Sequence, residues 1–310
     1  MVLGLQMSKQ PFNYTPWIQY ESEITNEETG KRHYSSKCGR VSSSTTTVLS
    51  NYEDKAFLEV WKSKMRAEGK DPDAIGNESA EKGTEAHLLV EEYLIDGVYP
   101  LGHELACTAI DAFYSHINPD YISAEQPVFY DALLDPKKPE DFQIAGRYDQ
   151  LLKIDSGVFK IAKTEEILKE QFLICDLKTK RSYEVLKSGK RKLKNLPRKD
   201  ACDMFFKNCL QASMYAATIS LQSDFKQRYG AGVGGAVLVY VNEEKSQLMY
   251  INRQDLNYYW RLFKDILRDF YGLKPLEKNW KTMIQDSNWR PDHINGGYQN
   301  NIPKEITLIK

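Results

Sequence analysis

The sequence lacks the features that would assign it quickly to a metal-cluster, secreted or membrane protein class. Its five cysteines include no Cys-x-x-Cys pair, which argues against a zinc ribbon, and their wide spacing argues against an iron–sulfur cluster. Reduced thiols of a cytosolic protein are therefore expected. No apolar stretch approaches the length of a membrane-spanning helix.

The chain also lacks an excess of either charge sign and any recognisable targeting segment. Its first residues resemble neither a secretory signal nor an Arg-rich presequence, so we expect a cytoplasmic protein. The net charge of -1 gives no overall attraction to nucleic acid, so such binding would require local basic patches. With 310 residues, the chain can form one large domain or two small ones.

The hydrophobic periodicity is helical in the first part of the chain and mixed after residue 125. Helices are predicted at Asp54–Glu68, Glu78–Asp96, Leu105–Ile117, Cys202–Leu221 and Leu256–Tyr271. Strands are predicted at Glu125–Leu133, Ile144–Ile154, Phe172–Lys178, Gly234–Val241 and Gln247–Ile251. This order predicts one α/β domain at residues 41–274 with a helical N-terminal cap. An irregular arm or hairpin is expected at residues 1–40, and a surface-packed tail at residues 275–310.

An aspartate and a lysine end the apolar strand predicted at residues 172–178. Side chains alternate along a strand, so Asp176 and Lys178 share one face while Leu177 points to the other. Buried charges are costly unless they bind something, and Asp149 on the preceding strand supplies a second carboxylate. Two carboxylates and a backbone carbonyl can hold Mg²⁺, which would activate a water for attack on a phosphate. Lys178 would then orient that water or neutralise the developing charge, although an ion pair between strands is the alternative.

Two pairs of residues one helical turn apart accompany this motif. Gly83, His87 and Glu91 fall on one line of a predicted helix, and the glycine leaves room for a strand or ligand. Gln211 and Tyr215 lie one turn apart on a later helix, where both side chains could hydrogen-bond phosphate or base. Each pair alone is compatible with an ordinary structural role. The remaining histidines, His33, His103, His116 and His293, are expected to be non-catalytic.

Together the four motifs resemble the RecB-type branch of the PD-(D/E)xK nuclease superfamily. They are Gly83-xxx-His87, Gly146-xx-Asp149, Asp176-x-Lys178 and Gln211-xxx-Tyr215, in the order found in that branch. Ser44-Thr-Thr-Thr-Val-Leu49 and Trp61 are also similar to phage exonucleases related to the mitochondrial genome maintenance exonuclease. The resemblance spans roughly residues 42–272. The insertion between Asp149 and Asp176 and the basic segment after Lys180 are longer than the family pattern.

The resemblance implies a restriction-endonuclease-like core, a small mixed β-sheet flanked by helices. It implies that His87, Asp149, Asp176 and the Leu177 carbonyl hold Mg²⁺ or Mn²⁺, and that Lys178 is the catalytic lysine. It implies that Gln211 and Tyr215 support the site and the DNA strand. Glu125 stands where the family often has an acid that opens the first sheet strand, and is a further candidate.

A strongly basic segment follows the predicted catalytic strand. Two interpretations remain open: a solvated loop, or an arm that contacts DNA phosphates, since neutralising phosphates releases counterions. Its position directly after Lys178 favours the arm. The candidate DNA-binding residues are Lys180, Arg181, Lys190, Arg191, Lys192 and Lys194.

The sequence therefore predicts a Mg²⁺- or Mn²⁺-dependent DNA exonuclease that acts on single-stranded or free-ended DNA, in the host cytoplasm if phage-encoded. A structure-specific endonuclease on the same core is one alternative. A nucleic-acid-binding module without cleavage is the other, although a pure binder has no need of the predicted metal pocket.

Overall fold

The computed structural model describes residues 20–25, 31–37, 39–53, 56–117, 122–132, 142–179, 183–185, 191–193, 202–221, 223–230, 232–287 and 304–309. The strands are β1 (Tyr20–Thr25), β2 (Arg32–Ser36), β3 (Val41–Ser44), β4 (Ile122–Asp131), β5 (Gln143–Ile154), β6 (Phe159–Ile161), β7 (Gln171–Thr179), β8 (Tyr183–Val185), β9 (Arg191–Leu193), β10 (Gly235–Val241), β11 (Ser246–Asn252) and β12 (Lys304–Leu308). The helices are α1 (Thr45–Leu49), α2 (Ala56–Ala67), α3 (Pro72–Asp96), α4 (Glu104–Ala112), α5 (Cys202–Leu221), α6 (Ser223–Tyr229), α7 (Arg253–Phe270) and α8 (Trp280–Asp286), with a 3-10 turn at Tyr114–His116. None of the described helices is long and apolar enough to cross a membrane.

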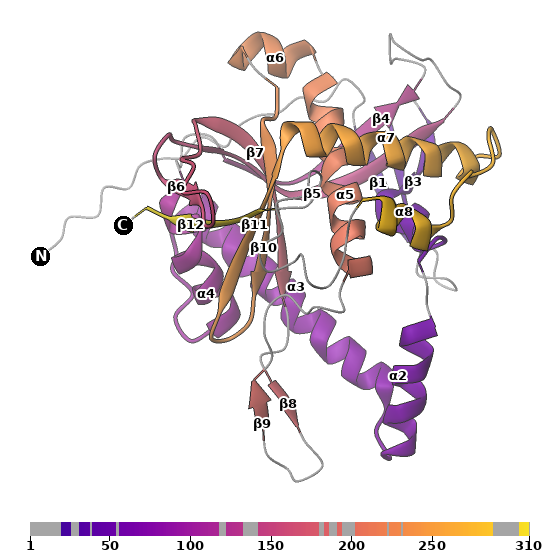
Figure 1. Ribbon diagram of the computed structural model, residues 1–310, viewed down its shortest axis with the longest axis vertical. Coiled ribbons are helices and arrows are strands. Elements are labelled where there is room, and N and C mark those ends of the chain that lie inside the picture. The colour runs from indigo at the N-terminus through magenta and orange to yellow at the C-terminus, as the bar shows by residue number, and fades with distance from the viewer. Residues whose placement is uncertain are drawn as a thin grey trace, which may run out of the picture.

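A ten-stranded mixed sheet runs through the molecule (Figure 1). Its order is β1-β2-β3-β5-β7-β10-β11-β12-β6, and β4 pairs with β5 outside this path. The β3–β5 and β7–β10 pairs are parallel, and the other pairs are antiparallel. The predicted α/β class with a mixed sheet and flanking helices is confirmed, although the sheet is larger than the small one expected.

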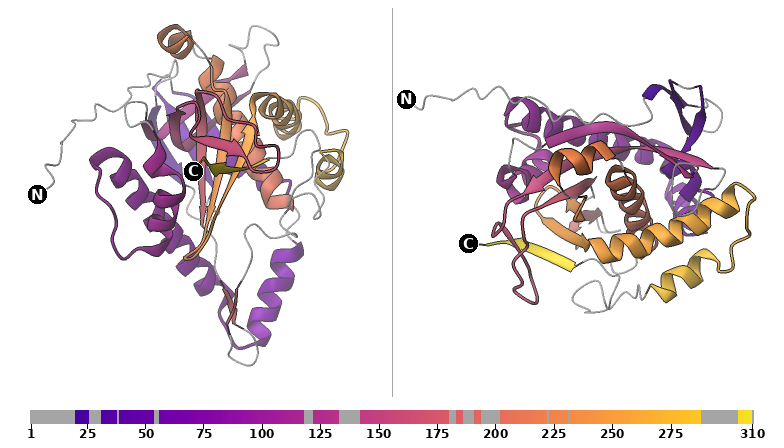
Figure 2. Two further views of the ribbon diagram at one scale, coloured as in Figure 1. Left: turned by 60° about the vertical axis from the view of Figure 1, so that its left-hand side comes forward. Right: turned by 90° about the horizontal axis from the view of Figure 1, so that it is seen from above.

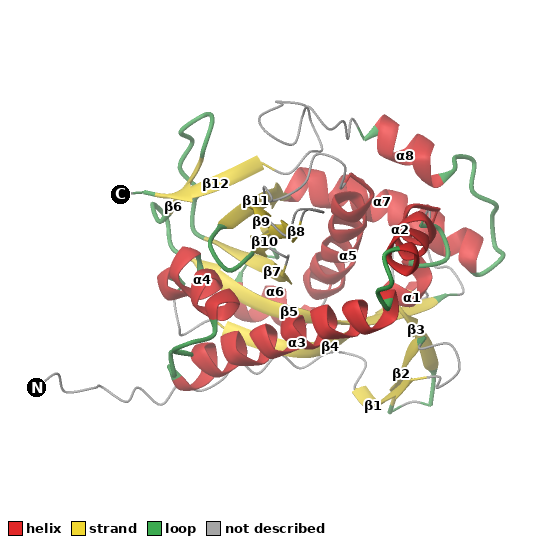
Figure 3. Ribbon diagram, turned by 90° about the horizontal axis from the view of Figure 1, so that it is seen from below, coloured by secondary structure: helices red, strands yellow, loops and turns green. Residues whose placement is uncertain are grey.

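Helices cover both faces of the sheet, as the view from below shows (Figure 3). One core cluster joins α5 and α7 to strand residues such as Ile174 and Leu238, and a second joins α3 and α4 to Leu173 and Val237. Consecutive residues of β7 thus enter opposite cores, which explains its continuous apolar run. The central strands are buried on both sides.

Local sequence signals set the long helix α3, which carries a predicted site residue. Asp71 caps its first turn by accepting hydrogen bonds from the backbone N–H groups of Asp73 and Ala74, and Pro72 occupies the first helical position. Gly97, with a left-handed φ of 73°, ends the helix. The helix therefore begins earlier than the predicted Glu78, because this capping signal precedes the apolar periodicity.

The N-terminal part of α3 and the preceding helix α2 project from the body of the protein (Figures 1 and 2). Val60 of α2 is 68% exposed, and Pro72 is the one buried residue among the described side chains of residues 58–85. The described side chains of α2 therefore do not pack into the main core.

Both ends of the described chain contribute strands to the sheet. Within the expected irregular arm, β1 and β2 form an antiparallel hairpin that joins β3. Within the expected surface tail, β12 lies between β11 and β6, pairing Ile306 with Leu248 and Ile161. This strand was missed because its alternating pattern is short and isolated.

Candidate metal centre and ion pair

The candidate site forms where β5 and β7 part. Their antiparallel pairing ends at Gln150 and Cys175, directly before Asp149 and Asp176. Beyond that point the Asp149 carboxylate replaces a backbone acceptor, because the Leu177 N–H donates to its Oδ2 at 2.8 Å. The two predicted acidic residues therefore flank the gap between the strands.

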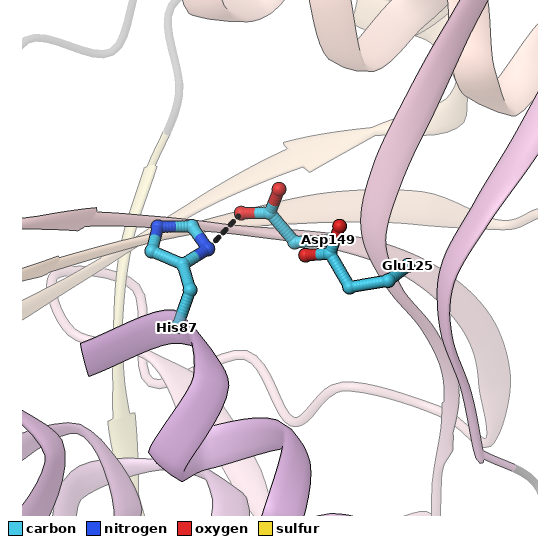
Figure 4. A group of neighbouring side chains, drawn as sticks. All are labelled: His87, Glu125 and Asp149. Atoms are coloured by element: carbon cyan, nitrogen blue, oxygen red, sulfur yellow. Dashed lines mark ion pairs between the residues drawn. The ribbon is translucent and has the colours of Figure 1, made fainter. Parts of the chain in front are cut away.

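Among the described residues, His87, Glu125 and Asp149 form a group that could hold a metal ion, which we call the metal-ligand cluster. One ligand atom from each lies within 4.8 Å of the others, and His87 Nδ1 is 3.4 Å from Asp149 Oδ2. Figure 4 shows the imidazole reaching from α3 toward the two carboxylates. Glu91, one turn beyond His87, lies on the same side of α3, as the helical spacing predicted.

Glu125 reaches the cluster through an unusual backbone conformation. Its neighbours Ala124 and Gln126 pair with Gln150 and Tyr148, so Glu125 stands opposite Asp149 across the β4–β5 pair. Its φ of 48° lies in the left-handed region, which is strained for a glutamate and is often found at functional sites. Burial, with the nearby charges of Asp149 and Glu91, raises the pKa of Glu125 to about 8. A cation would offset this mutual repulsion.

Asp176 and Lys178 form an ion pair beside the cluster. The Lys178 Nζ lies 2.9 Å from Oδ1 and 2.8 Å from Oδ2 of Asp176, whose carboxylate is almost completely buried. Burial raises the pKa of Asp176 to about 6, although Lys178 opposes the shift. Burial also disfavours the Lys178 ammonium, but Asp176 and Asp149 outweigh it and raise the pKa of Lys178.

The metal-ligand cluster of the described residues does not include Asp176, whose expected role as a metal ligand stays a prediction. Among described residues, the group that could hold a metal contains His87, Glu125 and Asp149, while Asp176 is held by Lys178. The Asp149 and His87 charges still act on the pKa of Asp176, so the ion pair and the cluster are electrostatically one site. Leu177 is fixed by its N–H, and the role of its carbonyl stays a prediction.

Gln211 and Tyr215 lie near the site on α5. The Gln211 Nε2 donates to the Tyr215 hydroxyl at 2.9 Å, and both side chains are buried. Burial raises the pKa of Tyr215, with smaller contributions from Asp176 and Asp149. Gly146 makes room for this ring, because a Cβ there would lie 2.6 Å from the Tyr215 Cε1. The predicted Gly146 and Tyr215 motifs thus meet in space.

Gly83 on α3 likewise makes room for a close contact. A Cβ at Gly83 would approach the Thr179 Oγ1 to 3.0 Å, so the glycine lets the helix cross close to the end of β7. His87 follows one turn later and reaches Asp149. The close approach of a strand was one of the two roles expected for this glycine.

The donor set fits Mg²⁺ or Mn²⁺. Carboxylate oxygens suit both ions, and an imidazole suits Mn²⁺ better than Mg²⁺. The Asp176 Oδ2 is buried without a hydrogen bond in the described part of the chain, despite its ion pair. An ion held by His87, Glu125 and Asp149 would add a positive charge near that oxygen.

Several predicted residues cannot be placed relative to this centre. Lys180, Arg181, Lys190, Lys194 and His293 lie outside the described residues. Arg191 and Lys192 belong to β9, which pairs with β8 in a separate two-stranded sheet. His103 caps α4 by accepting the Ala106 N–H at Nδ1.

Sequence reasoning missed a buried network behind the two aspartates. The Tyr114 hydroxyl donates to Gln150 Oε1 at 2.8 Å and lies 3.2 Å from the Cys175 thiol. Gln150 and Cys175 are the last paired residues before Asp149 and Asp176. A polar glutamine within the apolar stretch of β5 was the signal that pointed to this network. Arg147, whose guanidinium lies close to Glu23, was also missed.

No protein-family model matches the sequence, and a search of curated proteins finds no match. Among solved structures, the chain is similar to SSO0001, with 16% sequence identity and a TM-score of 0.34. The similarity covers 73% of this chain and 75% of that chain. At this level it supports no conclusion about function.

Proposed function

We propose that the protein is a Mg²⁺- or Mn²⁺-dependent deoxyribonuclease, an exonuclease acting on single-stranded or free-ended DNA. The core around β5 and β7 would be restriction-endonuclease-like, as the motif resemblance implies. The observation that carries the proposal is the placement of the metal-ligand cluster directly beside the Asp176–Lys178 ion pair.

This arrangement has the groups needed for phosphodiester hydrolysis. A bound divalent ion would polarise the phosphate and lower the pKa of an attacking water. His87, Glu125 and Asp149 would hold the ion, while Asp176 would keep the Lys178 ammonium charged and directed. Lys178 would orient the water or stabilise the negative charge that develops on the phosphate. Gln211 and Tyr215 would keep the strand ends in place.

A structure-specific endonuclease on the same core remains the alternative within enzymes. The exonuclease is preferred from the motif resemblance and from the projecting α2 and α3, beside which a free strand could pass. A non-catalytic binding module is disfavoured because it would not require a strained glutamate next to buried, mutually repelling charges.

The test is cleavage of linear and covalently closed circular single-stranded DNA with Mg²⁺, with Mn²⁺ and with a chelator. We expect metal-dependent loss of the linear strand and survival of the circle. Rapid nicking of circles would favour the endonuclease, and binding without metal-dependent cleavage of either substrate would favour the binding module. The control variant is His116→Ala, which replaces an exposed histidine outside the site and should cleave like the wild type.

A further inference from the structure

A carboxylate lies between two guanidinium groups at the edge of the candidate site. The Arg147 Nη2 donates to Glu23 Oε2 at 2.9 Å, and the Arg32 Nη1 lies 3.9 Å from Glu23 Oε1. The two arginine side chains are 35% and 46% exposed, so solvent and ligands can reach them. Arginine forks bind carboxylates and phosphates with the same geometry.

Arg147 is placed to act on a ligand of the metal-ligand cluster. It lies two residues before Asp149 on β5, a spacing that separates residues by roughly 7 Å along a strand. Its charge lowers the pKa of Glu125 and of Glu91, both of which are raised chiefly by burial. A phosphate next to the one at the metal would therefore reach this guanidinium.

The present pairing of Arg147 is incomplete. Its Nε is buried and has no hydrogen-bond partner among the described residues, although its Nη2 binds Glu23. A structural arginine at this depth would be expected to satisfy that donor. Glu23 lies on β1 at one edge of the sheet, where local opening costs less free energy than in the core.

Resting on the proposed function, we propose that Arg147, with Arg32 beside it, binds the DNA phosphate adjacent to the one that is cleaved. Glu23 occupies this phosphate site in the free protein and is displaced when DNA binds. The carboxylate thus competes with the substrate, and the two members of one ion pair have opposite effects on DNA affinity.

The experiment measures binding of a labelled single-stranded oligodeoxythymidylate by fluorescence anisotropy in chelator-containing buffer. Arg147→Ala should weaken binding about tenfold, and Arg147→Lys should recover only part of it because the fork is lost. Glu23→Gln should tighten binding about threefold, by removal of the competing charge. Glu21→Gln on the same strand and Arg268→Ala on α7 are matched controls that should leave affinity unchanged.

Oligonucleotides with one neutral methylphosphonate linkage identify the phosphate concerned. At one linkage, wild type should lose about tenfold in affinity while Arg147→Ala loses nothing more, because the same contact is already absent. Additive losses at every linkage, or a Glu23→Gln variant that binds no tighter, would overturn the phosphate site and leave a structural ion pair. Wild-type protein that binds the strand but never cleaves it refutes the nuclease instead, and the binding measurements still decide the phosphate site.

Discussion

A lysine 2.8 Å from an almost fully buried carboxylate restricts the protonation of both groups. Breaking such a pair leaves one unpaired buried charge, which is strongly unfavourable. The choice of substitution therefore decides whether a variant reports on catalysis or on folding.

We predict that Asp176→Asn and Lys178→Met each reduce metal-dependent cleavage at least a hundredfold, because the charge-stabilising lysine is lost or misdirected. The double variant, which removes both charges of the pair, should fold and still bind DNA. Cleavage rates measure the loss of activity, and circular dichroism shows whether each variant is folded. Lys160→Ala on β6 is the lysine control. Turnover at the wild-type rate in either single variant would contradict the assignment.

His87 should be a ligand rather than a structural histidine. We expect His87→Ala to weaken Mn²⁺ binding about tenfold or more, since one of three cluster ligands is removed. Calorimetric titration of Mn²⁺ measures this, with His116→Ala as the matched control. Equal affinities for His87→Ala and the wild type would return His87 to a packing role.

The raised carboxyl pKa values predict a pH dependence of stability. Asp176 rises from 3.8 to about 6 and Glu125 from 4.5 to about 8. As the pH rises, both carboxyls lose their protons at a lower pH in the unfolded chain than in the folded protein. The metal-free protein should therefore lose stability between about pH 4 and 8. We expect Tm to fall by about 5 °C from pH 5 to 8.

This fall in Tm should be smaller with saturating Mn²⁺ and in Asp176→Asn or Glu125→Gln. Differential scanning calorimetry across the pH range is the measurement. A metal-free Tm that rises over this window would show that the two carboxyls are not perturbed in the predicted direction.

At the scale of elements, the packing of β5 against α5 depends on one glycine. A Cβ at Gly146 would also lie 2.9 Å from Thr45 Oγ1, in addition to the Tyr215 ring. We predict that Gly146→Ala destabilises the protein by about 1–3 kcal/mol through overpacking and reduces activity by displacing Tyr215.

Gly76→Ala is the matched control for this substitution. Gly76 lies on the exposed part of α3, where a Cβ would have nothing within 4 Å, so alanine should stabilise the helix by about 0.5–1 kcal/mol. Urea unfolding of both variants measures the two free energies. Equal destabilisation would mean that steric contact at Gly146 is not the cause.

The central elements could be predicted from sequence because their signals are local. The boundaries of α5 are those predicted, β5 begins one residue earlier, and β7 extends one residue further at each end, since local periodicity and apolar stretches define these elements. By contrast, β6 and β12 depend on partners distant in sequence. Short strands of this kind carry little intrinsic pattern.

The candidate residues of the site could be selected from the sequence, but which of them lie close together could not. Spacing alone placed Asp176 and Lys178 on one face, and their ion pair agrees. The proximity of Glu125 to Asp149 required the β4–β5 register and a left-handed residue, neither of which is encoded in local spacing. The contact of Arg147 with Glu23, which lies 124 positions earlier, likewise could not be inferred from local spacing.

At the scale of the whole molecule, the net charge of -1 leaves DNA binding to local charge. We predict that replacing Lys190, Arg191, Lys192 and Lys194 with Ser weakens binding similarly for all sequences, because phosphate contacts carry no base information. Each lost contact should reduce the slope of log affinity against log salt by about 0.7.

A salt titration of anisotropy in metal-free buffer measures this slope. Cleavage at saturating DNA should change little, because the metal-ligand cluster is untouched. Coinciding slopes for variant and wild type would show that these basic residues do not contact DNA phosphates, and would place the DNA path elsewhere.

The position of β12 has a consequence for the order of synthesis and folding. Among the described strands, β6 joins the main sheet only through β12, by the pairing of Ile161 with Ile306. On the ribosome, β6 therefore cannot join the sheet until residues 304–308 have emerged. Until then the edge of β11 is unpaired and can capture a strand from another nascent chain. The pairing of β12 thus covers an edge of β11 that would otherwise be open to other strands.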